Sequence, residues 1–158
     1  MVSMVTDLRT EIKQRKPFGS VEQEAQLNLE RTAAVLGHSF AEALKRFGVT
    51  PTQYNALRIL RGAGKDGLCR NEVRDRMISQ VPDVTRLLDR LEDAGLVERE
   101  RLTTDRRQVA TRITQKGLDL LGQLDEPVAA MHKRALGHMS QEQLKALTEL
   151  LTIARQGA

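Results

Sequence analysis

The stretch that decides the fold spans residues 80–117 and reads QVPDVTRLLDRLEDAGLVERERLTTDRRQVATRITQKG. In its first part, apolar residues recur at the spacing of one buried face of an α-helix. These residues are Val84, Leu87, Leu88 and Leu91. Pro82 suits the first turn of a helix, and Gly95 suits the position just after its end. The sequence therefore predicts a short amphipathic helix between Pro82 and Gly95.

Two strand-like segments follow this helix, at residues 96–102 and 108–113. The second places Val109, Thr111 and Ile113 at every other position, which is the period of a half-buried strand. Polar residues separate the two segments. We predict a β-hairpin with charged side chains at its tip.

Two further short helices are expected before residue 80. Thr50 and Gln53 have the spacing of a capping box, and with Pro51 between them they predict a helix that runs to about Arg61. Glycines at positions 62, 64 and 67 indicate a loop, and residues 71–77 a second short helix. In this layout the third helix can enter the major groove of DNA while the hairpin reaches an adjacent minor groove.

A longer helix is expected on the N-terminal side of this central part. Residues 1–19 indicate a short amphipathic piece followed by a break, and Ser20 with Gln23 predicts a capping box at the start of the long helix. An apolar stripe along this helix is expected to be buried. It comprises Leu29, Ala33, Leu36, Phe40, Leu44 and Phe47.

The chain is expected to be helical again from Thr114, with a kink at Pro127 and a capping box at Ser140 and Gln143. The order of elements predicts a mainly α protein with a small β-hairpin wing. Its fold class is therefore a winged helix-turn-helix flanked by N- and C-terminal helices.

Composition narrows the setting of the protein. Its net charge of +4 over 158 residues suits a nucleic-acid partner, but residues 70–107 contain nine Lys and Arg against nine Asp and Glu. DNA binding then depends on how these charges are distributed over faces. The single cysteine, Cys69, excludes an intramolecular disulfide, and the sequence has no apolar run that could span a bilayer. We expect a cytoplasmic protein without a membrane partner.

Polar and basic side chains gather at the start of the third short helix, where they can meet phosphates and base edges. The predicted DNA contacts are Ser79, Gln80, Pro82, Asp83, Thr85, Arg86 and Arg90. Arg86 has the chemistry to bind a guanine through two hydrogen bonds. At the hairpin tip, Arg106 or Arg107 can enter a narrow minor groove, and Asp105 can orient one of them.

An alternative for the helix arginines stays open at this point. Arg86 can pair with Asp83 or Asp89, and Arg90 with Asp93, as solvated charges on an exposed helix face. In that case the lobe can bind a protein instead of DNA, because its charge is balanced overall.

The ordered combination of these segments resembles the MarR (multiple antibiotic resistance regulator) family. The resemblance is carried by residues 50–54 (TPTQY), 88–97 (LDRLEDAGLV), 105–107 (DRR), 113–117 (ITQKG) and 140–144 (SQEQL). It implies a homodimer whose terminal helices pair across a two-fold axis and which represses transcription from a pseudo-palindromic double-stranded DNA operator. The implied parts are an N-terminal arm at 1–19, a dimerisation helix at 20–48, a DNA-binding lobe at 49–115 and C-terminal dimerisation helices at 116–158.

The resemblance also assigns roles to particular residues. Val84-Thr85-Arg86 matches the segment of the recognition helix that contacts DNA, and Asp105 with Arg107 matches the Asp-x-Arg of the wing, where the acid braces the arginine. Three positions depart from the family's usual residues. Arg74 stands in place of a small residue, Ile78 of a glycine and Asp83 of a serine or threonine.

The family resemblance further implies a small aromatic or phenolic effector, bound between the dimer helices and the DNA-binding lobe, that releases repression. Candidate contacts are His38, Phe40, Phe47, Tyr54 and Arg58, although Phe40 and Phe47 also fit the core stripe.

Other functions have less support in the sequence. It has no glycine-rich phosphate loop and no recognisable nucleophile, so we expect neither an enzyme nor a cofactor. His38, Cys69, His132 and His138 lack the spacing of metal ligands, so no metal is expected. A redox role for Cys69 is a lesser alternative, since the family's peroxide sensors carry their cysteine in the first long helix.

Overall fold

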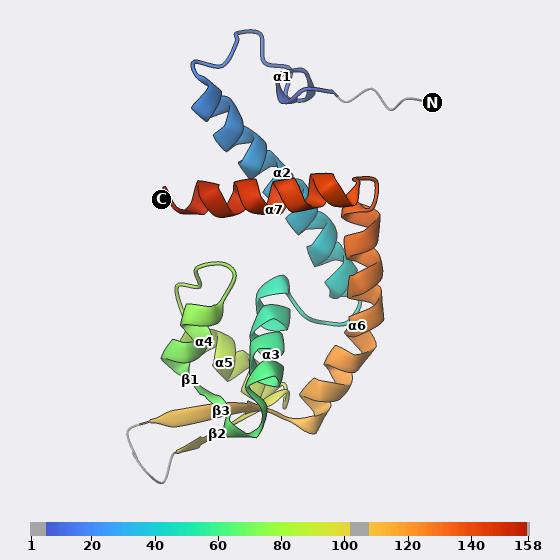
Figure 1. Ribbon diagram of the computed structural model, residues 1–158. Coiled ribbons are helices and arrows are strands. Elements are labelled where there is room, and N and C mark those ends of the chain that lie inside the picture. The colour runs from blue at the N-terminus through green and yellow to red at the C-terminus, as the bar shows by residue number, and fades with distance from the viewer. Residues whose placement is uncertain (1–5, 102–107, 158) are drawn as a thin grey trace. The chain divides into compact units, whose positions relative to one another are not determined.

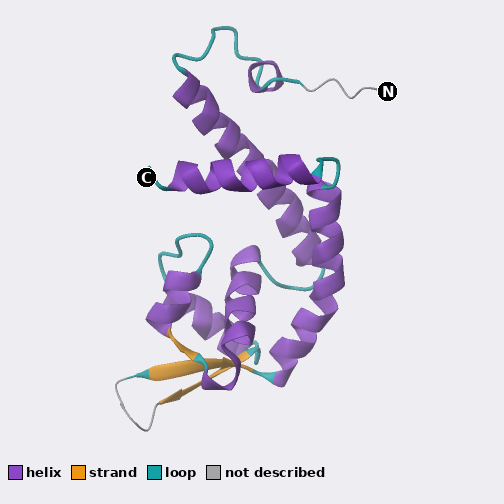
Figure 2. Cartoon of the chain, in the orientation of Figure 1, coloured by secondary structure: helices purple, strands orange, loops and turns teal. Residues whose placement is uncertain are grey.

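The computed structural model describes residues 6–101 and 108–157 (Figure 1). The chain divides into two compact units, Met1–Ser39 and Phe40–Ala158. Most of the chain is helical, and the strands are confined to one small sheet (Figure 2), which confirms the predicted fold class. Within the described ranges, no helix combines the length and the apolar character needed to cross a membrane.

The first unit contains α1 (Leu8–Glu11) and most of α2 (Val21–Lys45). Ser20 receives a hydrogen bond at its Oγ from the Gln23 N–H, at 3.2 Å, as predicted. The Gln23 side chain, however, accepts from the Gly19 N–H at 2.6 Å and not from Ser20. The predicted capping box is therefore only half present, because the return bond is displaced by one residue.

The prediction of one buried stripe along α2 was wrong. Of its six residues only Leu44 is buried in the single chain, whereas Leu29 and Ala33 are exposed. Phe40 and Phe47 are half-buried and pack against the core of the second unit. The residues of the stripe that pack against this core all belong to the last turns of α2 and the residues just after it, within the second unit.

Three short helices form the body of the second unit. They are α3 (Pro51–Ala63), α4 (Arg70–Arg76) and α5 (Val84–Asp93). The capping box predicted for α3 is confirmed: the Gln53 N–H donates to Thr50 Oγ1 at 3.2 Å, and the Gln53 side chain accepts from the Thr50 N–H at 2.9 Å. Gly62 was predicted to lie in a loop but remains helical, and a 3-10 turn, η1 (Gly64–Asp66), follows.

The helix α5 matches its predicted apolar face, since all four residues of that face are buried. Its start differs from the prediction, because Asp83 is the N-cap and Pro82 lies before the helix. The Asp83 carboxylate accepts from the Arg86 N–H at 2.9 Å and so provides the cap. At the other end, Gly95 adopts a φ of 71° and closes the helix, as predicted.

A three-stranded antiparallel sheet carries the wing, with strand order β1-β3-β2. The strands are β1 (Leu68–Cys69), β2 (Val97–Arg101) and β3 (Val109–Ile113). The predicted hairpin is confirmed, but the two-residue strand β1 was missed. In β3, the neighbouring residues Ala110 and Thr111 are both buried and Val109 is exposed, which contradicts the predicted alternation. Gly67 is required beside β3, since a Cβ there would lie 2.6 Å from the Thr111 carbonyl oxygen.

Two helices complete the second unit, α6 (Gln115–Leu136) and α7 (Gln141–Arg155). The predicted capping box of α7 at Ser140 and Gln143 is confirmed, and α6 continues through Pro127. On α6, Leu121 and Leu124 are fully buried in the core. By contrast, α7 contains no buried residue.

Candidate nucleic-acid interface

The predicted DNA contacts lie on two neighbouring pieces of the second unit. Ser79, Gln80 and Pro82 lie in the turn between α4 and α5, and all three are exposed. Asp83 caps α5, and the exposed residues Thr85, Arg86 and Arg90 lie along that helix. The side chains of these residues are therefore available to a partner, while the opposite face of α5 is fixed in the core.

Two acidic residues of α5 form ion pairs with an arginine of the wing. Arg99 on β2 approaches two acidic residues of α5, with Nη2 2.6 Å from Asp89 Oδ1 and 2.5 Å from Glu92 Oε2. Its Nε also donates to Glu92 at 2.8 Å, and these hydrogen bonds raise the pKa of Arg99. The two acids of the helix are thus held by an arginine of the wing.

This contact leaves the arginines of α5 available. Arg86 and Arg90 form no ion pair with any residue in the ranges 6–101 and 108–157. The alternative in which Arg86 pairs with Asp83 or Asp89 was therefore wrong: Asp89 binds Arg99, and Asp83 accepts the backbone N–H of residue 86. Equal numbers of acidic and basic residues in the segment 70–107 therefore do not mean that the exposed arginines of α5 are neutralised by its acids.

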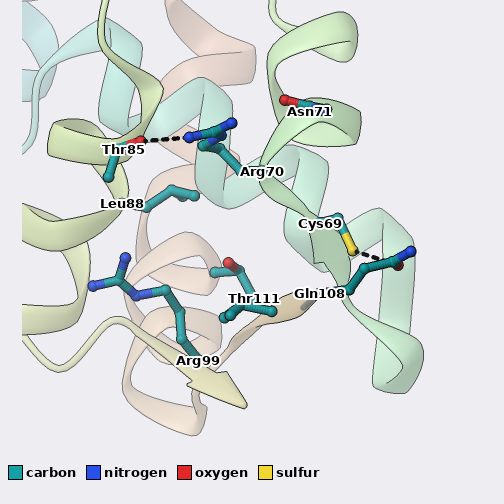
Figure 3. Close-up of a pocket in the computed structure, with 9 residues that line it drawn as sticks. Cys69, Arg70, Asn71, Thr85, Leu88, Arg99, Gln108 and Thr111 are labelled. Carbon is teal, nitrogen blue, oxygen red and sulfur yellow. Dashed lines mark hydrogen bonds between the residues drawn. The ribbon is translucent and has the colours of Figure 1, made fainter. Parts of the chain in front are cut away.

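A pocket of about 480 Å³ lies between α5, the start of α4 and the wing sheet (Figure 3). Arg70 at its rim donates to Thr85 Oγ1 at 3.4 Å, which links α4 to the exposed face of α5. Cys69 also lines the pocket, half-buried, with Sγ 3.5 Å from Gln108 Oε1. Arg70 and Arg99, which both line this pocket, were missed as functional candidates from the sequence.

The turn between α4 and α5 is held by a hydrogen bond to Asn55. This residue of α3 is 9% exposed, and its side-chain oxygen accepts the Ile78 N–H at 2.9 Å. Met77 and Val81 pack against the core on either side, whereas Ile78 is 83% exposed. Asn55 was not predicted from the sequence as a functional residue, although a polar residue within the buried run 54–57 indicates a hydrogen-bond partner.

The base of the wing is held by Arg112 on β3. Its guanidinium donates to Glu100 on the neighbouring strand at 2.5 Å and to the Lys65 carbonyl at 2.6 Å. These contacts fix the strands that lead to the tip. The tip residues predicted to contact DNA, Asp105, Arg106 and Arg107, lie outside the described residues.

The predicted effector contacts are brought together only in part. Phe40 and Tyr54 pack edge to face, with ring centroids 5.6 Å apart, and the ring centroid of His132 lies 6.1 Å from that of Phe40. Burial raises the pKa of Tyr54, while the charge of the exposed Arg58 acts to lower it. Phe47 instead contacts Arg46, whose guanidinium carbon is 4.9 Å from the ring centroid.

Of the remaining predicted effector contacts, His38 is exposed and belongs to the first unit. Close to the aromatic cluster, Arg61 of α3 binds Asp125 of α6 at 2.9 Å, which raises the pKa of Arg61. His132 is exposed on α6, and the sequence did not predict its position beside Phe40.

A three-helix lobe with a small wing sheet and exposed arginines on the third helix has the architecture of a winged helix-turn-helix DNA-binding protein. The model of the MarR family matches residues 47–108. The MarR transcription factor from Planctomyces limnophilus is 40% identical, and the match covers 87% of this chain and 99% of that one with a TM-score of 0.67. The chain belongs to the MarR family of transcription regulators.

Two more distant solved structures share this fold. Sco3205 from Streptomyces coelicolor, solved in complex with DNA, is 22% identical over 91% of this chain and 92% of its own, with a TM-score of 0.78. The organohalide-sensing regulator RdhR, solved in its 2,4-dichlorophenol-bound form, is 17% identical over 92% of this chain and 88% of its own, with a TM-score of 0.80.

Proposed function

We propose that this regulator represses transcription as a homodimer bound to a pseudo-palindromic operator, and that a small aromatic or phenolic molecule releases it. The main observation in support is that the acidic residues of α5 are paired and its exposed arginines are available. Arg86 and Arg90 face solvent without an ion pair among the described residues, while Asp89 and Glu92 are held by Arg99. Unpaired guanidinium groups on the exposed face of the third helix are suited to phosphates and guanine edges.

The exposed apolar surface of the terminal helices supports dimerisation. On α7, Leu150 is 63% and Ile153 57% exposed, and on α2, Leu29 and Val35 are 38% and 48% exposed. Exposed apolar side chains on a helix favour burial against a partner, and a second copy of the chain supplies matching residues. In such a dimer, two α5 helices would read half-sites one helical turn apart, roughly 34–36 Å.

The aromatic cluster supports a phenolic effector. The half-buried Phe40 and the exposed His132 place aromatic rings beside the buried Tyr54, and the charge of Arg58 acts on the Tyr54 hydroxyl. An aromatic acid or phenolate has both the ring and the negative charge to match such a site. The dichlorophenol bound by the structurally similar RdhR is a ligand of this class.

The roles of the wing tip are part of the same proposal. Arg107, braced by Asp105, would enter the minor groove, and Arg106 would contact the adjacent backbone. Arg112 and its partners Glu100 and Lys65 hold the strands on which this tip is mounted.

Binding to the DNA upstream of the protein's own gene tests the proposal. Fluorescence anisotropy over a salt series, with unrelated DNA as competitor, measures affinity, specificity and the number of phosphate contacts. We expect tight, competitor-resistant binding that weakens steeply with salt, and release when 2,4-dichlorophenol or a benzoate is added. Equal and weak binding to both DNAs would contradict the proposal and favour a module that binds protein.

A further inference from the structure

Ile78 is an exposed apolar side chain that the fold itself does not explain. The turn between α4 and α5 carries Met77, Ile78 and Val81, and two of these pack half-buried against the core. Ile78 is instead 83% exposed, more than any other large hydrophobic residue in the described part of the chain. Because the side chain of Ile78 is not packed in the core, we looked for a contact with a molecule outside the chain.

The position of Ile78 is fixed by its backbone. The N–H of Ile78 donates to the side-chain oxygen of the buried Asn55 at 2.9 Å, and the preceding Met77 N–H donates to the Arg74 carbonyl at 3.1 Å. Because Met77 and Val81 pack against the core on either side, the turn cannot rotate Ile78 inward without losing these contacts. The side chain is held facing outward.

The surroundings of Ile78 indicate what it meets. The next residues, Ser79 and Gln80, carry hydrogen-bonding groups, and the exposed Arg86 follows on α5. Such groups match the donors and acceptors of base edges, but Ile78 has neither. The one apolar group that base pairs present in the major groove is the C5-methyl group of thymine.

We propose that Ile78 packs against a thymine methyl group in each half of the operator and thereby selects thymine at that position. The inference rests on the proposed DNA-binding function and adds a specificity contact to it. The branched aliphatic side chain covers the methyl group and excludes water from it, while its polar neighbours bind the adjacent base edges.

Deoxyuridine gives a direct probe, since it keeps the pairing edge of thymine and lacks only the methyl group. Operator duplexes in which each thymine is replaced in turn by deoxyuridine are titrated with the wild type, with Ile78→Ala and with Ile78→Val. We expect one position per half-site at which deoxyuridine weakens wild-type binding about fourfold, the value of one buried methyl group. Ile78→Ala loses this sensitivity, and Ile78→Val retains most of it.

Gln80→Ala is the matched control, because it alters a neighbouring exposed residue of the same turn without removing the apolar contact. It should weaken binding to all duplexes alike and keep the sensitivity to deoxyuridine. Thermal unfolding of the Ile78 variants should match the wild type, since the side chain is exposed.

The possible results distinguish a failure of the DNA-binding function from a failure of the methyl contact alone. Wild-type protein that does not prefer its operator over unrelated DNA refutes the proposed function. If operator binding is specific but insensitive to deoxyuridine, or if Ile78→Ala remains as sensitive as the wild type, the methyl contact is refuted and the function stands.

Discussion

The helices α5 and α7 are both amphipathic, but only α5 has its apolar face buried within the single chain. The four apolar residues of α5 are buried and its acids are bound by Arg99, whereas α7 has no buried residue and exposes Leu150 and Ile153. The DNA-binding lobe is therefore complete within one chain. The helix α7 has an amphipathic pattern but no buried residue, as the proposed dimer interface requires.

The largest difference in stability is expected when one leucine is removed from each helix. Leu91→Ala leaves a cavity in the fully buried core of the lobe and should lower the free energy of unfolding by about 2–5 kcal/mol in urea denaturation. Leu150→Ala removes the same atoms from a side chain that is 63% exposed in the single chain. At concentrations where the protein is monomeric, its effect should be within about 0.5 kcal/mol. Equal losses of unfolding free energy in the two variants would show that α5 and α7 do not differ in burial within the monomer.

A charge placed on α7 should separate subunit association from folding. Ile153→Asp puts a carboxylate on the exposed apolar face and should weaken the dimer by about 3 kcal/mol, because an unpaired charge would be buried between subunits. Light scattering after size-exclusion chromatography would then show a monomer at concentrations where the wild type is a dimer. A variant that remains dimeric shows that this face is not the interface.

Asn55 tests whether the lobe depends on its buried polar contact. Asn55→Ala leaves the part-buried Ile78 N–H without its acceptor and should cost about 1–3 kcal/mol of stability, measured by chemical denaturation. We also expect operator affinity to fall, since the turn before α5 loses its anchor. Ser79→Ala, an exposed change in the same turn, serves as the stability control. Unchanged stability in Asn55→Ala would show that the turn is held by packing alone.

A change at the wing tip should affect operator binding and leave folding unchanged. Arg107→Ala should weaken operator binding about tenfold, or 1.4 kcal/mol, by removing a minor-groove contact without altering the core. Circular dichroism and light scattering should be unchanged. Arg9→Ala, in the first unit, is a charge-matched control, and equal effects of the two changes would refute the assignment of the wing.

The sequence predicted the parts of this structure that depend on local spacing. The buried face of α5, its end at Gly95 and the capping boxes of α3 and α7 all follow from residues within one or two helical turns. Even so, local rules failed at Pro82, since they do not decide whether a proline lies inside a helix or just before an N-cap such as Asp83.

The features that the sequence did not predict depend on contacts between elements. Asn55 meets Ile78 across 23 residues, and the two-residue strand β1 exists only because β3 lies beside it. Arg99 is an instructive case: it shares a strand face with the buried Val97, which indicates a partner, but nothing local identifies Asp89 and Glu92. The exposure of the α2 stripe was also unpredictable, because helical spacing marks an apolar face without saying what covers it.

If the exposed arginines of α5 contact the operator, Arg86→Ala should lose affinity for operator DNA. Measured by anisotropy beside the wild type over a salt series, the variant should bind about 1–3 kcal/mol more weakly and tolerate replacement of one guanine in each half-site. An unchanged affinity and an unchanged preference at every guanine would contradict the account, because Arg86 would then be a solvated charge that does not contact DNA.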